Sequence, residues 1–119
     1  MPPRTEPADK LYRQIMQMHD QAFAAERYEV AYHLLAAAMH AAEELKSVDL
    51  LERLEAMALT RQSEIDETAP GHTISSGSAH RRGHSALFAN LATTAAAARG
   101  RIAADSVVAR IREQNINAD

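Results

Sequence analysis

Histidine is the residue type in this chain whose chemistry and spacing could build a site. The chain has six histidines and no cysteine. In a helix, Glu29 lies one turn before His33, so the imidazole can meet the carboxylate. The same holds for His40 and Glu44 on the same face. A metal ion needs three or four converging ligands, and this face offers only two separated pairs, so we predict no metal site and no cofactor. A His/Glu metal-binding bundle stays open as an alternative.

A second group of basic residues lies in a Gly/Ser-rich stretch at residues 70–85. Its members are His80, Arg81, Arg82 and His84. The stretch precedes a predicted helix, and a helix N-terminus can hold an anion. It lacks the lysine and the preceding strand of a phosphate loop. These four residues are our candidates for binding an anion, and a plain solvated linker is the favoured interpretation of the stretch.

The sequence does not favour an enzyme. Its serines gather in the same Gly/Ser-rich stretch, where a flexible backbone cannot hold a hydroxyl and a base in fixed geometry. The absence of cysteine excludes thiolate chemistry, disulfides and iron–sulfur clusters. We predict a protein that does not catalyse a reaction.

The composition and the first seven residues indicate where in the cell we expect the protein. No stretch approaches the roughly 20 apolar residues of a membrane-spanning helix. Residues 1–7 hold no apolar segment of the kind found in a secretory signal. The lack of cysteine also suits a reducing compartment. We expect a soluble cytoplasmic protein that does not contact a membrane.

Three runs of apolar residues at helical spacing precede an abrupt break at Pro70-Gly71. In the first run, Leu11, Ile15 and Met18 recur at steps of four and three. The predicted helices cover about 6–26, 28–46 and 48–67. Their short connections force consecutive helices to lie antiparallel. We predict an all-α fold, with an acidic antiparallel three-helix up-down-up unit at 1–69, a flexible linker at 70–85 and a C-terminal helix at 86–119.

The C-terminal helix needs a docking site, because its apolar face is narrow. That face comprises Leu87, Leu91, Ala95, Ala98 and Ile102, followed by Val108 and Ile111. Residues 1–69 hold 7 Lys/Arg and 13 Asp/Glu and carry −6, whereas residues 70–119 hold 6 Arg and 3 acidic residues and carry +3. Opposite charges attract within one molecule or between two copies. The helix either covers the three-helix unit of its own chain or swaps onto a second copy, and we expect a homodimer.

The first two runs resemble a tetratricopeptide-type helical hairpin over residues 15–58. The residues in register are Ile15, Met18, His19, Ala22, Tyr28, Ala31, Leu35 and Ala38. This family alternates large and small residues so that the two helices interlock, as Tyr28 and Ala31 would do here. His19 departs from the pattern, which has a small residue at the helix crossing. The resemblance implies binding of a protein or peptide and no catalysis.

We therefore predict a small helical protein–protein interaction module that binds a partner helix or peptide in a groove between helices. The residues predicted to line the groove are Tyr12, Met16, Phe23, Tyr32 and Met39. The alternative interpretation for the same residues is that they form the core. A helical regulator that contacts nucleic acid through the Arg-rich C-terminal segment is the alternative function. It is not favoured, because the arginines do not share one helix face.

Overall fold

The computed structural model describes residues 6–117, and the regular secondary structure of this part of the chain is all helical, without a strand. Its helices are α1 (Glu6–Ala24), α2 (Tyr28–Glu44), α3 (Val48–Thr68), α4 (Ser76–Arg81) and α5 (Leu87–Asn117). The predicted all-α fold class is confirmed.

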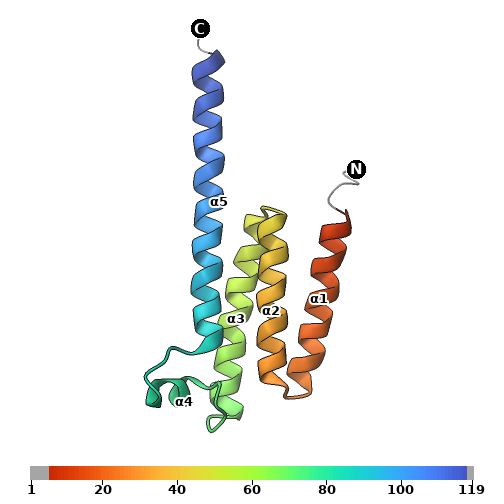
Figure 1. Ribbon diagram of the computed structural model, residues 1–119, viewed down its shortest axis with the longest axis vertical. Coiled ribbons are helices and arrows are strands. Elements are labelled where there is room, and N and C mark those ends of the chain that lie inside the picture. The colour runs from red at the N-terminus through yellow and green to blue at the C-terminus, as the bar shows by residue number, and fades with distance from the viewer. Residues whose placement is uncertain (1–5, 118–119) are drawn as a thin grey trace.

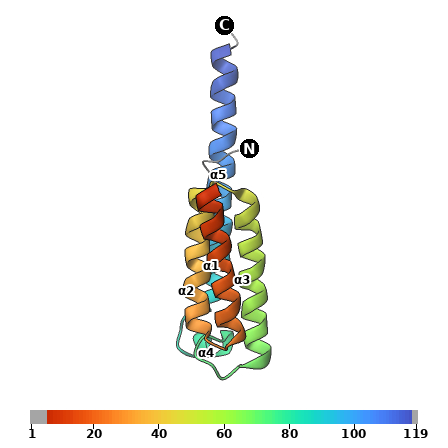
Figure 2. The same ribbon diagram turned by 90° about the vertical axis from the view of Figure 1, so that its right-hand side faces the viewer.

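The four long helices run alternately down and up the molecule (Figure 1). The most extensive packing joins α1 to α2 and α3 to α5, and α2 contacts both α3 and α5. Figure 2 shows α2 and α3 side by side, with α1 in front of them and α5 behind. The first half of α5 therefore docks on its own chain, and its second half continues well past the ends of α2 and α3 (Figure 1).

The connections after α1 and α2 use the same backbone turn. The N–H of Arg27 donates to the carbonyl of Ala22 at 2.9 Å, and Glu26 adopts a left-handed φ of 61°. After α2, Lys46 has a φ of 52°, and the next N–H again reaches back to the helix, to Ala42, at 3.1 Å. This is the hydrogen-bond pattern of a Schellman turn, which usually has glycine at the left-handed position. These turns are tight, and they bring consecutive helices alongside each other.

The limits of α3 follow local sequence signals. The Ser47 hydroxyl accepts from the N–H of Leu50 at 3.1 Å and caps the start of the helix. Asp49 in the first turn suits the positive end of the helix dipole. The helix ends at Thr68, two residues before Pro70-Gly71, as a proline dictates.

The segment predicted as a flexible linker is hydrogen-bonded in the structure and contains α4. Ser75 is almost fully buried, and its hydroxyl both donates to the carbonyl of Pro70 at 2.7 Å and accepts from the N–H of Ser78 at 3.1 Å. Gly83 in this segment has a left-handed φ of 73°, a conformation that glycine adopts without strain. The Gly/Ser composition therefore serves tight turns and a helix cap here, which composition alone does not distinguish from a linker.

The core is built largely from alanine, which lets the helices approach closely. Ala31, Ala38, Ala42 and Ala58 are each 0% exposed. The large buried side chains are few: Phe88, Leu35, Leu51, Leu54 and Ile65. Phe88 is the only aromatic residue outside the first two helices. Its ring lies edge-on to Tyr32, with centroids 5.6 Å apart, and anchors α5 against α2.

Candidate functional site

The five residues predicted to line a groove lie in or against the core. Tyr12 and Met39 are buried, at 8% and 4% exposure. Met16, Phe23 and Tyr32 are partly buried and pack against the same cluster. Burial raises the pKa of the Tyr12 hydroxyl, as expected for a phenol inside the bundle. In this conformation a partner would reach Tyr12 and Met39 only if the helices separated.

His19 on α1 is the most completely buried titratable side chain described here, with 0% exposure. Its Nδ1 lies 2.7 Å from the carbonyl oxygen of Ala31 on α2. Its Nε2 accepts a hydrogen bond from the Nε of Arg61 on α3 at 3.1 Å. Because a guanidinium only donates, Nε2 must be the unprotonated nitrogen and Nδ1 must carry the hydrogen. The imidazole is therefore neutral and joins three helices.

Arg61 extends this network to the surface. Its guanidinium lies over the ring of Phe23, 4.2 Å from the centroid, in a cation–π contact. It also donates to the carboxylates of Asp20 at 2.9 Å and Glu64 at 3.3 Å. Each of the three guanidinium nitrogens therefore donates one hydrogen bond. The network is a structural clamp between α1 and α3.

The pKa of His19 is lowered. Burial is the main cause, because it disfavours the charged imidazolium, and the adjacent Arg61 charge acts in the same direction. The hydrogen bond to the Ala31 carbonyl opposes the shift but does not reverse it. A proton added to Nε2 would also remove the acceptor that Arg61 uses. The network therefore favours neutral His19.

The histidines of α2 do not converge on a metal site. His40 contacts Glu43, three residues away, with its Nδ1 3.5 Å from Oε1, and Glu44, four residues away, does not appear in this ion pair. His33 lies against the ring of Tyr32. Among residues 6–117, no group of three or more histidine, cysteine or acidic side chains could hold a metal ion.

The four basic residues predicted to bind an anion are divided by the structure. The Nη2 of Arg82 donates to the carbonyl of Thr73 at 2.6 Å, so this side chain helps hold the loop. Arg81 donates to the hydroxyl of Ser78 at 3.4 Å and lines a different hollow, beside Pro70 and Gly77. His80 and His84 are exposed. The four side chains therefore do not form one cluster.

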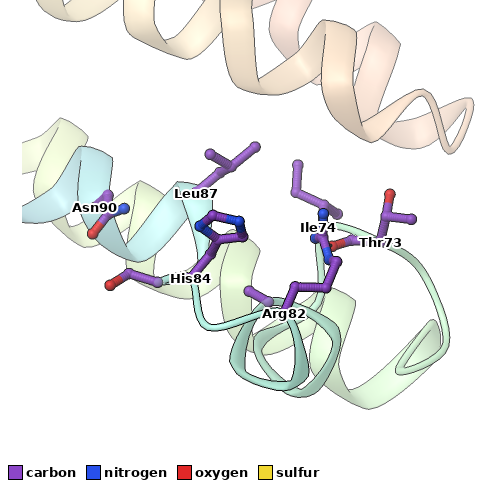
Figure 3. A pocket seen from close by; sticks show the side chains of 8 residues that line it. Thr73, Ile74, Arg82, His84, Leu87 and Asn90 are labelled. Carbon is purple, nitrogen blue, oxygen red and sulfur yellow. The ribbon is translucent and has the colours of Figure 1, made fainter.

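A shallow cleft of about 320 Å³ lies beside the start of α5. It is lined by Thr73, Ile74, Ala79, Arg82, His84, Ser85, Leu87 and Asn90. Figure 3 shows Arg82 and His84 near the apolar side chains of Ile74 and Leu87. The cleft offers one guanidinium that is already bonded to the backbone and one exposed imidazole, which is a weak basis for holding an anion.

Asp66 is the residue that organises the loop, and no local sequence signal predicts this role. One carboxylate oxygen accepts from the N–H of Ser76 at 2.7 Å and the other from its hydroxyl at 2.6 Å. The side-chain amide of Gln62 donates to the same carboxylate at 3.2 Å. Burial alone would raise the pKa of Asp66, but the bonds from Ser76 and Gln62 outweigh it and lower that pKa. Ten residues separate Asp66 from Ser76, so no spacing rule pairs them.

The second half of α5 is the least covered part of the fold. Residues 103–115, hereafter the α5 tail, are all exposed. Three of their large apolar side chains are about half exposed: Val107 at 46%, Val108 at 45% and Ile111 at 50%. Together with Ala104 they form one stripe along the helix, hereafter the tail stripe. No helix among residues 6–117 is long and apolar enough to cross a membrane.

The tail stripe does not continue the face by which α5 packs on the bundle. The packed face comprises Leu91, Ala95, Ala98 and Ile102. At 3.6 residues per turn its continuation beyond Ile102 falls on Asp105, Ser106, Ala109 and Glu113, most of which are polar. The tail stripe lies on the opposite side of the helix. It is a second apolar surface, directed away from the bundle.

Comparison of the chain with protein-family models, with curated proteins and with solved structures finds no match. The resemblance to tetratricopeptide-type hairpins therefore stays a prediction made from the residues alone.

Proposed function

We propose that this chain is a small helical protein–protein interaction module, and that it meets its partner through the tail stripe of α5. The observation that carries the proposal is the exposure of Val107, Val108 and Ile111 on a helix that projects from the bundle (Figure 1). An amphipathic helix with an uncovered apolar stripe commonly packs against another helix. The bundle of α1, α2, α3 and the first half of α5 then serves as the scaffold that holds this helix.

A tetratricopeptide-like hairpin is the form we propose for α1 and α2. The alternation of large and small residues is present in the packing, where Tyr28, Ala31, Leu35 and Ala38 are all buried. His19 occupies the crossing where the family has a small residue. Its bond to the Ala31 carbonyl explains how a larger side chain is accommodated there. The hairpin supports a binding role without itself supplying the exposed surface.

Nucleic-acid binding has less support. Arg99 donates to the carboxylate of Glu55 at 2.8 Å, and Arg101 lies 3.8 Å from that of Glu43. These two charges are therefore used within the chain to hold α5 on the bundle. Arg110 and Arg112 are exposed on the tail, and a short pair of arginines is too little charge for a nucleic-acid surface.

Site-specific photo-crosslinking in cells tests the proposed function. A photoreactive amino acid is placed at Val108 and, as a matched control, at Leu59, which is 50% exposed on α3. We expect protein adducts from position 108 that decrease when Ile111→Asp is added in the same chain. Circular dichroism checks that this variant keeps its helical content, which the full exposure of the tail leads us to expect.

Equal adduct yields from positions 108 and 59 would contradict the proposal, because they would show that the tail stripe binds other proteins no more than any exposed apolar residue does. The mass of each adduct identifies the partner. Adducts that form at position 108 in excess over position 59, and that Ile111→Asp reduces, support an interaction module, whether the captured protein is another copy of this chain or a different protein.

A further inference from the structure

We propose that the partner of the tail stripe is a second copy of this chain, with the two α5 tails running antiparallel in a two-fold symmetric pair. This inference rests on the proposed function, since it names the partner of the same surface. It is argued from the arrangement of apolar and charged side chains on the tail.

The apolar side chains of the tail are self-complementary. When two tails run antiparallel with the two-fold axis near Ala109, Val107 packs against Ile111 of the partner subunit, and Ile111 against Val107 of the partner subunit. Val108 then lies close to the axis, beside Val108 of the partner subunit. This arrangement covers the three side chains that are 45–50% exposed in the single chain.

The charges of the tail match in the same register. Asp105 and Arg112 are exposed on the same flank of the tail stripe, about two turns apart. An antiparallel pair brings like flanks together, so Asp105 faces Arg112 of the partner subunit and the contact is repeated by symmetry. Arg110 lies on the other flank, about as far round the helix from the tail stripe as Asp105, so it comes near Arg110 of the partner subunit beside the axis. Both long side chains extend outward into water, where salt screens their repulsion. Antiparallel helix dipoles add to the preference for this direction.

The acidic bundle of a second copy is a poorer partner for the tail. The arginines nearest the bundle, Arg99 and Arg101, already pair with Glu55 and Glu43 of their own chain. Tail-to-tail pairing needs no surface other than the tail stripe itself and closes at two copies. The seam is only about 20 Å long. We therefore expect a weak dimer, below the size of a standard stable interface of roughly 1,200 Å².

Sedimentation equilibrium of the purified full chain, up to millimolar concentration, measures the pairing. We expect a monomer–dimer equilibrium whose dissociation constant rises at least about tenfold in Ile111→Asp, because two apolar contacts are lost per dimer. Leu59→Asp is the matched control and should leave the constant unchanged. Asp105→Arg and Arg112→Asp should each weaken the dimer about fivefold, and the double variant should restore it, since the charges are exchanged.

Single cysteines test the direction of the helices, and the chain has no cysteine of its own to interfere. Val108→Cys, near the axis, should form a disulfide dimer under mild oxidation. Ala104→Cys should not, because in the antiparallel pair its two copies lie about 15 Å apart along the seam, beyond the reach of a disulfide. Leu59→Cys reports random collision.

A chain that stays monomeric across the whole concentration range would overturn the inference. So would Val108→Cys dimers that form no faster than those of Leu59→Cys, or efficient dimers of Ala104→Cys, which indicate parallel helices. A monomeric chain that still gives photo-adducts with another protein from position 108 would leave the proposed function in place and refute only the dimer. A chain that stays monomeric and gives no excess of photo-adducts from position 108 would refute both the dimer and the proposed function.

Discussion

Protonation of His19 should destabilise the bundle as the pH falls from 7 to 5. In the unfolded chain its imidazole has an ordinary pKa of 6.5, whereas burial and the Arg61 charge lower that pKa in the folded chain. Between the two pKa values the unfolded chain binds the proton more readily, so the free energy of unfolding decreases as the pH falls. The stabilisation is complete above pH 6.5 and is lost as the pH falls through the folded-state pKa.

The size of the effect follows from linkage. An imidazole that stayed neutral in the folded chain down to pH 5 would reduce the free energy of unfolding by about 2 kcal/mol between pH 7 and pH 5. This is the upper limit for one histidine. It is a substantial part of the 5–15 kcal/mol typical of a domain, so it is measurable by urea unfolding at a series of pH values.

His19→Asn is the variant that isolates this contribution. The asparagine side-chain amide keeps a donor for the Ala31 carbonyl, but it cannot take up a proton. It removes the acceptor of Arg61, so we expect a loss of about 1 kcal/mol at pH 7 together with a shallower pH dependence. His33→Asn, which removes an exposed histidine of α2, controls for the loss of an imidazole as such. If His19→Asn and wild type lose equal stability between pH 7 and pH 5, the neutral buried imidazole is not the cause.

Three further predictions concern the backbone and the loop. Gly100→Ala should stabilise the chain by up to about 1 kcal/mol, seen as a higher Tm, because no neighbouring element lies within 4 Å of the added methyl group. Gly83→Ala should lower the Tm, since φ is 73° there. Glu26→Gly should raise the free energy of urea unfolding by about 0.5–1 kcal/mol, because it relieves a left-handed φ of 61°; no gain would mean that this turn is not strained. Asp66→Asn should speed amide hydrogen exchange in residues 70–83, because Ser76 loses its carboxylate partner. The stabilisation from Asp66 holds above the unfolded carboxyl pKa of 3.8 and is lost at lower pH; unchanged exchange in the variant would show that the loop is held by other bonds.

Helical spacing predicted the long helical runs, and α3 ends just before the predicted break at Pro70-Gly71. The ordered loop at 70–85 could not be predicted, because it depends on Asp66, which lies in another helix and pairs with Ser76 only after folding. The role of His19 was missed for the same reason, since its partners Ala31 and Arg61 are distant in sequence.

The apolar residues of α5 change helix face after Ile102, and this change is visible in the sequence, but its consequence is visible only in the structure. Val108 and Ile111 were read as a continuation of the stripe that ends at Ile102, but the step from Ile102 to Val108 does not match whole helical turns, so they lie on opposite sides. That change of phase was present in the sequence. Its meaning required the fold, which shows that the bundle ends where the phase changes.

In a core built largely from alanine, a few large buried side chains such as Phe88 contribute a large share of the buried apolar area. The tail stripe contributes nothing to that core, because Val107, Val108 and Ile111 lie on the opposite side of α5 and beyond the bundle. An apolar stripe that does not stabilise its own fold costs solubility unless something covers it. The separation also has a practical consequence: substitutions in the tail should change the proposed association while leaving the bundle intact. Effects on stability and effects on binding can therefore be measured independently in this chain.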